Sequence, residues 1–438
     1  MPEDTPQYVK WFRNSAPYIN ANRNKLMVLM LDGEAVAENH VLDIVHDITL
    51  LASLGVKLVL VHGARPQIAA RLEQQQIEAQ FHNNVRITDP ATLSCVKEAV
   101  GSLRCDLEAM LSMGLANSPM HGARLKVTGG NYVVAKPIGI RDGIDFQHSG
   151  DVRRIDTVAI HKALDEGNIV LLSPLGYSPS GEVFNLFSEY LATEAAIALK
   201  ADKLIFFCGA EGVCDQAGNL ISELNTEQAQ ALIESKVLPA DIEVHVKAAC
   251  HACNAGIQRT HLVSYRMDGA LLTELYTRDG SGTLITLKNY EHIRQATIAD
   301  VSGIIALIRP LEKQGTLVRR SRELLEAEID RFIVIERDGA VIGCAALYPI
   351  DDHCDIGELA CVAVHPDYQR EQRGDKLFRH ICQYAKSLKL QQLLVLTTHT
   401  AHWFLEKGFI QRSLEELPES RQARYNRQRN SKVYSYQL

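Results

Sequence analysis

A chain of 438 residues is too long for one hydrophobic core, because single domains usually hold about 100–200 residues, so two or three domains are predicted. With 46% hydrophobic and 23% charged residues, the composition is that of a folded globular protein and excludes a largely disordered chain. The formal net charge of −7 argues against a general nucleic-acid-binding protein and favours a small-molecule partner.

The first residues of the sequence lack the apolar run that is typical of a secretory signal. The stretch MPEDTPQYVKWFRN is polar, and no stretch of the chain reaches the roughly 18 apolar residues that a membrane span needs. We therefore expect a cytoplasmic protein that has no membrane partner.

The 10 cysteines are scattered singly through apolar segments, which is typical of reduced thiols in a core. Cys250 and Cys253 form one CxxC pair inside a helical pattern, and no second pair accompanies them. We expect small core residues there rather than metal ligands or a redox pair.

The predicted elements begin with an amphipathic helix at residues 8–22. We expect this helix to break near Pro17 and to present Trp11, Phe12 and Tyr18 as an apolar stripe. Strand, helix, strand and helix follow in KLMVLML, VLDIVHDITLLASLG, VKLVLVHG and PQIAARLEQQQ, which is the order of parallel α/β units. The alternation recurs as far as the strands THLVSY and GTLITL.

A different pattern follows the short polar segment KNYEHI. FIVIERDGAVIGCAALYPI predicts an antiparallel hairpin that turns at Asp338 and Gly339, and GELACVAVHP predicts the next strand. A helix (GDKLFRHICQYAKSL), a strand, a second helix and a last strand complete this region. The predicted organisation is an amino-terminal helix at 1–25, a first α/β domain at 26–287, a linker at 288–291 and a second domain at 292–438.

A polar loop, HPDYQREQRG, leads from the strand GELACVAV into a helix. N–H groups and the dipole at a helix N-terminus form an anion site that would suit a pyrophosphate. The segment resembles the acetyl-CoA-binding loop of the GNAT superfamily, whose pattern is Arg or Gln, two residues, Gly, one residue, and Gly or Ala. Gln369 and Gly374 match the first and last positions, but Gln372 replaces the first glycine. Because an ordinary connector could also have this sequence, the loop alone does not identify the cofactor.

The GNAT resemblance implies that acetyl-CoA binds to the loop and to the strand before it. In the superfamily the pantetheine chain pairs with that strand, which here corresponds to the backbone of Cys361, Val362 and Val364. Arg370 and Arg373 would add positive charge next to the phosphates, whereas Asp375 would oppose them unless it turns away. The expected cofactor residues are Cys361, Val362, Val364, Gln369, Arg370, Gln372, Arg373, Gly374 and Asp375.

Glu358 opens the same strand and, at a period of two, would share a face with Val362 and Val364. Desolvation on an apolar face would raise the pKa of a carboxyl group, which would suit it to take a proton from a substrate ammonium. A solvent-exposed glutamate at a strand end is the alternative interpretation.

Nearly the whole chain resembles the bacterial N-acetylglutamate synthases. The segments that carry the resemblance include EKQGTLVRRSRE, IGELACVAVHPDY, HWFLEKGF, ELPESR and YNRQRNSKV. The resemblance implies a GNAT-type α+β domain with a mixed sheet at 292–438, which transfers acetyl from acetyl-CoA to the amino group of L-glutamate without a metal.

The same resemblance implies a role for individual residues. It places the general base on Glu358 and the proposed acid, a serine or threonine in the next strand, on Thr397. Many GNAT enzymes use a tyrosine as the acid, but Leu405 stands at that position, which adds weight to Thr397. Arginine forks bind carboxylates best, and the family places the substrate's partners on Arg320, Arg429 and Ser431. We expect the other arginines of the same tail, Arg421, Arg424 and Arg427, to be solvated.

Residues 26–287 resemble the amino acid kinase fold of acetylglutamate kinase, a three-layer α/β domain. Phosphoryl transfer needs cations, but Met30 stands where the kinases have a lysine, and His245 stands where they have a second one. Glu189 replaces an expected aspartate, and the glycine-rich turn is His62, Gly63, Ala64 and Arg65. These departures argue against ATP chemistry.

The resemblance implies instead that this domain binds L-arginine as a regulator. The matching positions are Tyr18 on the first helix and Glu274, Gly280 and Gly282 before the last strand. Glu274 could pair with a guanidinium, while the glycines would leave backbone N–H groups for a carboxylate. A hairpin turn with a surface glutamate is the alternative. Because the first helix interlaces subunits in arginine-sensitive relatives, we expect a homo-oligomer, with a hexamer as the first choice.

Three other functions compete with glutamate acetylation. A phosphotransferase would need the cation that Met30 lacks, and a non-catalytic amino-acid sensor would not need Glu358, Arg320 and Arg429. An acetyltransferase for another acidic amino acid stays open, because the sequence does not measure acceptor selectivity.

Overall fold

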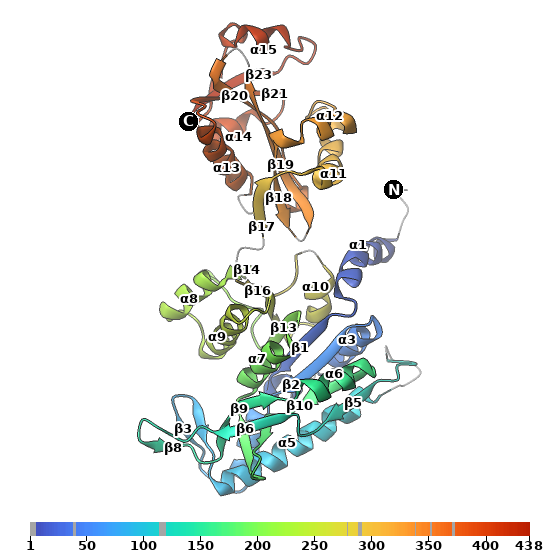
Figure 1. Cartoon of the computed structure of the whole chain (residues 1–438), viewed down its shortest axis with the longest axis vertical. Coiled ribbons are helices and arrows are strands. Elements are labelled where there is room, and N and C mark those ends of the chain that lie inside the picture. Colours follow the sequence, from blue (N-terminus) through green and yellow to red (C-terminus); the bar gives the residue numbers. More distant parts are fainter. Residues whose placement is uncertain are drawn as a thin grey trace. The chain divides into compact units, whose positions relative to one another are not determined.

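The computed structural model describes residues 6–37, 41–113, 120–277, 279–287, 291–337, 339–350, 353–369 and 373–438. The chain divides into two compact units, Met1–Asn289 and Tyr290–Leu438 (Figure 1). Residues 288–290 of the predicted linker lie outside the described residues. Within the described ranges, no helix has the length and apolarity needed to span a membrane.

An eight-stranded sheet forms the centre of the first unit, in the order β14-β16-β15-β13-β1-β2-β10-β5. Its strands are β1 (Leu26–Leu31), β2 (Lys57–His62), β5 (Lys126–Gly129), β10 (Asn168–Leu172), β13 (Lys203–Cys208), β14 (Glu223–Asn225), β15 (Arg259–Ser264) and β16 (Thr283–Thr286). Neighbouring strands are parallel except β15 and β16. All residues of β1 and β13 are buried, as expected for parallel strands covered on both faces.

Helices cover both faces of this sheet, so the first unit has three layers (Figure 1). One core contains side chains of α3 (Val41–Ser53), α4 (Arg65–Gln74), α5 (Pro90–Leu111) and α10 (Ala270–Tyr276). The other core contains side chains of α6 (Thr157–Asp165), α7 (Ser188–Leu199), α8 (Thr226–Glu234) and α9 (Ala240–Asn254). Alternate residues of β1 enter the two cores, and the predicted three-layer α/β fold is confirmed.

Short strands that we did not predict extend the first unit. A closed barrel contains β6 (Val133–Pro137), β9 (Ser149–Ile155), β11 (Leu175–Tyr177) and β12 (Val183–Leu186). Two hairpins add β3 (Gln80–His82) with β4 (Val85–Ile87), and β7 (Ile140–Arg141) with β8 (Ile144–Asp145). The short helix α2 (Gly33–Ala37) follows β1. Most of these strands have too few residues to show a hydrophobic period.

The first helix, α1 (Gln7–Asn22), continues through Pro17, so the predicted break is wrong. Pro17 and Arg13 are exposed, and water can therefore satisfy the carbonyl that loses its N–H partner. Tyr18 packs against the core, whereas Trp11 and Phe12 are half-exposed or more, so the three aromatic residues do not share one buried stripe.

Cys250 and Cys253 lie on α9 with both thiols in the core, as predicted. The Cys253 thiol donates to the carbonyl of Ile285 at 3.3 Å. Burial raises the pKa of both thiols, that of Cys250 to about 11, so neither is a reactive thiolate near neutral pH.

A seven-stranded mixed sheet forms the second unit, in the order β17-β18-β19-β20-β21-β23-β22. Its strands are β17 (Glu291–Gln295), β18 (Phe332–Arg337), β19 (Ala340–Ile350), β20 (His353–Val364), β21 (Gln392–Thr397), β22 (Ile410–Arg412) and β23 (Lys432–Gln437). Only β20 and β21 are parallel among the described pairs. The mixed sheet confirms the predicted α+β class.

Two cores flank this sheet. Helices α11 (Val301–Lys313) and α12 (Arg322–Ala327) pack on one face, and α13 (Arg373–Ser387) and α14 (Ala401–Glu406) pack on the other. The last helix is α15 (Glu419–Ala423). Gly339 follows β18 with a φ of +74°, in the predicted hairpin turn, while Asp338 lies outside the described residues.

Candidate functional site

A β-bulge interrupts β20 at Cys361. Against β19 the register runs from Leu347↔Leu359 to Ala346↔Ala360 and then shifts to Cys344↔Ala363. Cys361 has a φ of +54°, and an extra residue of this kind bends its strand. Pairing with β21 extends only from Ile356 to Glu358 in the described part of β20. The strands therefore part after Glu358, which leaves backbone N–H and C=O groups of β20 for a ligand.

The bulge also changes which face each side chain of β20 occupies. Three side chains pack in the core beside α13: Leu359, Val362 and Val364. Two pack in the core beside α11: Cys361 and Ala363. Because Leu359 and Val362 share a face, the period of two fails between them. Our prediction that Glu358 shares a face with Val362 and Val364 is wrong, since the extra residue turns those two side chains to the other face.

Glu358 forms a bidentate ion pair with Arg421 of α15. Arg421 Nε lies 2.5 Å from Glu358 Oε2, and Nη2 lies 2.9 Å from Oε1. Both side chains are about four-fifths buried, so the pair is shielded from bulk solvent. Our prediction that Arg421 is solvated is wrong. The sequence signal that could have identified it is the segment ELPESR, which ends at this arginine and carries part of the family resemblance.

The predicted substrate residues Arg320 and Arg429 converge on one segment. Arg429 Nη2 donates to the carbonyl of Thr316 at 2.5 Å, four residues before Arg320. Burial would lower the pKa of Arg320, but the neighbouring Cys361 and Tyr348 outweigh burial and raise it. Arg320 therefore lies near the bulge of β20 and stays charged.

Thr397 and Ser431 lie at neighbouring strand ends. Thr397 is the last residue of β21 and pairs with Lys432, the first residue of β23. Ser431 directly precedes Lys432 in the chain. The Thr397 hydroxyl oxygen is 2.9 Å from that of Thr400 and accepts the Thr400 backbone N–H at 3.1 Å. The carbonyl of Ser431 accepts a hydrogen bond from the Tyr425 hydroxyl at 2.7 Å. The Thr397 hydroxyl is thus held in place by a local turn.

The cofactor loop is only partly described, because Arg370 and Gln372 lie outside the described residues. Arg373 is 2% exposed and its Nη2 pairs with Glu291 Oε1 of β17 at 2.5 Å. Glu291 also pairs with Arg337 at 3.3 Å, so two guanidinium groups share one carboxylate, and the positive charge expected from Arg373 near the phosphates stays a prediction.

Three other loop residues have defined positions. Gln369 Nε2 donates to the carbonyl of Val364 at 3.2 Å, and Asp375 pairs with Lys407 at 2.7 Å. A Cβ on Gly374 would lie 3.3 Å from the Trp403 ring, so glycine lets α14 pack against the start of α13. Because Lys407 neutralises Asp375, this carboxylate does not impose a free negative charge on the helix N-terminus.

Among the predicted regulator residues of the first unit, Glu274 has a buried side chain. Glu274 is 5% exposed at its side chain and accepts hydrogen bonds from His261 Nδ1 at 2.6 Å, Ser281 N at 2.7 Å and Gly282 N at 2.9 Å. Burial works to raise the pKa of Glu274, but His261 and these N–H groups outweigh it and lower the pKa. The alternative of a surface glutamate is wrong.

These contacts change how a ligand carboxylate could bind there. The Ser281 and Gly282 N–H groups already donate to Glu274, so a ligand would have to displace its carboxylate. Gly280 has a φ of +70°, and a Cβ at this position would clash with the Glu274 carboxylate.

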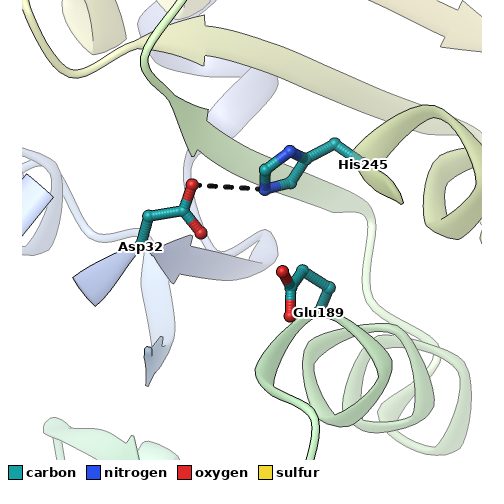
Figure 2. Close-up of side chains that lie close together, drawn as sticks. All are labelled: Asp32, Glu189 and His245. Atoms are coloured by element: carbon teal, nitrogen blue, oxygen red, sulfur yellow. Dashed lines mark ion pairs between the residues drawn. The ribbon is translucent and has the colours of Figure 1, made fainter. Parts of the chain in front are cut away.

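The residues at which the sequence departs from the kinases have different surroundings in the structure. Met30 is fully buried in β1. Burial lowers the pKa of His62 to about 4, and its Nε2 lies 2.9 Å from the Ser173 hydroxyl. Asp32, Glu189 and His245 lie together at the carboxyl end of β1 (Figure 2).

Comparisons with known proteins agree with this architecture. The chain matches the model of the amino acid kinase family over residues 25–264 and that of the GNAT acetyltransferase domain over residues 328–411. An amino-acid acetyltransferase of Azotobacter vinelandii is 57% identical over 432 residues, covering 98% of this chain and 99% of the relative.

Two solved structures of N-acetylglutamate synthase from Neisseria gonorrhoeae are also similar, at 36% identity over 99% of this chain and 100% of theirs. The structure complexed with coenzyme A and L-arginine gives a TM-score of 0.90, and that complexed with coenzyme A and N-acetyl-glutamate gives 0.64. The chain therefore belongs to the amino-acid acetyltransferase family, with an amino acid kinase domain followed by a GNAT domain.

Proposed function

We propose that the chain is an N-acetylglutamate synthase, which transfers acetyl from acetyl-CoA to the α-amino group of L-glutamate and releases CoA. The observation that carries the proposal is the opening between β20 and β21, which starts beside the largely buried side chain of Glu358. Membership of the amino-acid acetyltransferase family supports the chemistry, and similarity to the Neisseria N-acetylglutamate synthase supports glutamate as the acceptor.

Acetyl-CoA would lie along the bulged strand. Its pantetheine amides would pair with the backbone of Cys361, Val362 and Val364, and its pyrophosphate would lie at the N-terminus of α13 near Gly374. A backbone N–H of the bulge would donate to the thioester oxygen, where negative charge develops. Gln369, Arg370, Gln372, Arg373 and Asp375 complete the proposed loop, with Arg373 contributing through its backbone because its side chain pairs with Glu291.

Glu358 would act as the general base. It would take a proton from the substrate ammonium, directly or through water, and the free amine would attack the thioester carbonyl. The tetrahedral intermediate would collapse with loss of the CoA thiolate, which Thr397 would stabilise or protonate. No covalent enzyme intermediate is needed.

The ion pair with Arg421 requires a step before proton transfer. Both oxygens of the Glu358 carboxylate accept hydrogen bonds from Arg421, so the substrate ammonium would have to compete with this guanidinium for the carboxylate. We infer that a carboxylate of glutamate, bound with Arg320, Arg429 and Ser431, competes for Arg421 and frees Glu358. Arg421 would then be a positioning residue that keeps the base inactive until the acceptor has bound.

The first unit would carry regulation by L-arginine, the end product of the pathway that acetylglutamate begins. The proposed site lies between α1 and α10 and includes Tyr18, Glu274, Gly280 and Gly282. Asn22 of α1 donates to the carbonyl of Leu275 on α10 at 3.1 Å, so the two helices that would enclose the ligand are in contact. Inhibition requires that arginine bind one arrangement of the protein more tightly than another.

The exposed aromatic residues of α1 support self-association. Tyr8 is 73% exposed, Phe12 62% and Trp11 50%, and they lie within five residues of each other. Large apolar side chains gathered on a surface mark interaction sites. A homo-oligomer with α1 at the interface, in first choice a hexamer, would cover them.

One assay tests the proposed function. Purified protein is incubated with acetyl-CoA and a panel of amino acids, with and without arginine, and release of the CoA thiol is followed. Glutamate-dependent release that arginine suppresses is the expected result. Faster release with another acidic amino acid would overturn the acceptor assignment, and consumption of ATP would indicate a phosphotransferase.

A further inference from the structure

Three side chains of metal-ligand type meet at the carboxyl edge of the first unit's sheet (Figure 2). Asp32 follows β1, Glu189 is the second residue of α7, and His245 lies on α9. One ligand atom from each, two carboxylate oxygens and an imidazole nitrogen, lie within 4.8 Å of one another. Glu189 and His245 occupy positions at which the sequence departs from the kinase pattern, and the proposed acetyl transfer uses none of the three.

The ring of His245 is oriented for coordination through Nε2. Its Nδ1 lies 2.8 Å from the carbonyl of Asp241 and must carry a hydrogen, because a carbonyl only accepts. Nε2 points towards Asp32, has no hydrogen-bond partner and belongs to a side chain that is 3% exposed. Metal-binding histidines commonly have this arrangement, with the second nitrogen fixed by a backbone carbonyl.

The spacing of the side-chain atoms suits a shared metal ion. His245 Nε2 and Asp32 Oδ2 are 3.4 Å apart. Two ligands of one tetrahedral zinc ion are separated by about 3.4 Å, given bonds near 2.1 Å, so this spacing is compatible with a shared metal ion. Glu189, within 4.8 Å of both, would have to approach by up to about 1.4 Å to complete the set.

The charges around the cluster also favour a cation. Asp32 and Glu189 are 18% and 4% exposed at their side chains, and Arg65 Nη2 lies 3.1 Å from Glu189 Oε1. The Ser188 hydroxyl donates to Glu189 Oε2 at 3.0 Å. One arginine does not offset two carboxylates.

We propose that Asp32, Glu189 and His245 bind a divalent transition-metal ion, best matched by Zn²⁺, in the first unit. Imidazole and carboxylate ligands suit zinc. Mg²⁺ instead prefers oxygen ligands and retains several bound waters, so a buried site with an imidazole ligand suits it less well. Three protein ligands leave a fourth position for water. The ion joins β1, α7 and α9, so it binds the folded state and stabilises this unit. This site departs from the metal-free protein that we expected from the sequence.

The test uses full-length protein freed of metal with a chelator. We expect calorimetry to show one Zn²⁺ bound per chain at micromolar concentration or tighter, with a rise in the unfolding temperature of the first unit and no comparable response to Mg²⁺. Co²⁺ should bind without an intense thiolate charge-transfer band, which separates this site from the cysteines. Anomalous scattering at the zinc edge should locate the ion between the three side chains.

Variants make the test specific. Glu189→Gln and His245→Gln should each weaken Zn²⁺ binding at least 100-fold. His251→Gln, on the exposed side of the same helix, should bind zinc like the wild type. Zinc binding that is absent from the wild type, or equal in wild type and His245→Gln, would overturn the proposal and leave an imidazolium as the cation of the cluster. If a variant fails to fold, the anomalous signal of the wild type still decides.

Discussion

In the first unit polar side chains gather where parallel strands end, whereas in the second unit they gather where one strand is bulged and leaves its neighbour. Asp32, Glu189 and His245 lie at the carboxyl edge of a sheet whose central strands are fully buried. Glu358 instead lies where the only described parallel pair of a mixed sheet opens.

The difference shows two ways in which a sheet can provide a ligand site. A parallel sheet brings loop residues together at one edge, whatever their chemistry, so the residues there can change while the site persists. A bulge exposes backbone N–H and C=O groups within a sheet, and these groups do not depend on side-chain identity. The first unit should therefore tolerate loss of its polar cluster without loss of acetyl transfer, while the second unit should not tolerate loss of Glu358.

The largest expected effect follows from Glu358→Gln. Removing a general base lowers turnover by about 10²–10⁴-fold, while the amide keeps the size of the side chain and acetyl-CoA binding stays near normal. Steady-state kinetics and calorimetry with acetyl-CoA measure the two quantities. Glu416→Gln, at an exposed carboxylate of the same unit, is the control and should retain activity. Wild-type turnover in Glu358→Gln would show that Glu358 is not the general base. It would also contradict the expectation that only the second unit depends on one side chain for acetyl transfer.

The two units should lose stability at different pH values as the solution is acidified. Burial lowers the pKa of His62 to about 4. The unfolded chain takes up a proton near pH 6.5 and the folded chain does not until about pH 4, so the unfolded state binds more protons in this window. The first unit should therefore lose about 3 kcal/mol of stability, from this group alone, as the pH falls from 6.5 to 4.

The second unit should keep its stability to a lower pH than the first. Arg294 lowers the pKa of Asp300 to about 2, so the stability from this ion pair is present above pH 4 and is lost only as the pH falls towards 2. Amide hydrogen exchange at a series of pH values follows both units in one sample. His62→Gln should flatten the profile of the first unit, and the exposed His251→Gln should not. Earlier loss of protection in the second unit would contradict this account.

The sequence predicted regular elements better than the details of the site. Buried strands such as β1 and the alternation of helices are periodic over many residues, so local patterns reveal them. The bulge at Cys361 is not periodic, since a single residue with a φ of +54° shifts the register, and it reversed the faces of Val362 and Val364. A bulge depends on the partner strand, which local sequence does not contain.

The partners of long-range ion pairs could not be predicted from the sequence either. Arg421 meets Glu358 across 63 positions and Arg373 meets Glu291 across 82, so nothing in the tail or the loop alone separates a buried partner from a solvated charge. The convergence of Asp32, Glu189 and His245 has the same cause. Their residue types and departures from the kinase pattern were visible, but their distances were not.

Arg421 provides a sharper test of the second unit. Arg421→Ala should lower kcat/KM for glutamate by about 10–100-fold, because the substrate carboxylate loses the guanidinium that it would take over from Glu358. The KM for acetyl-CoA should change little. Arg424→Ala, at an exposed arginine three residues later, should behave like the wild type. Equal activity of the two variants would return Arg421 to the solvated role expected from sequence.

The smallest expected effect concerns the regulator segment of the first unit. Gly280→Ala strains a φ of +70°, which costs about 1 kcal/mol, and forces the new Cβ against Glu274, which adds about 1–3 kcal/mol. Gly139→Ala has a similar φ of +75° and meets nothing within 4 Å, so it measures the backbone strain alone. Denaturant unfolding should rank Gly280→Ala below Gly139→Ala, and arginine titrations should show weaker inhibition in Gly280→Ala with unchanged turnover. Because the strain is matched, unaltered inhibition in Gly280→Ala would place the arginine site away from Glu274.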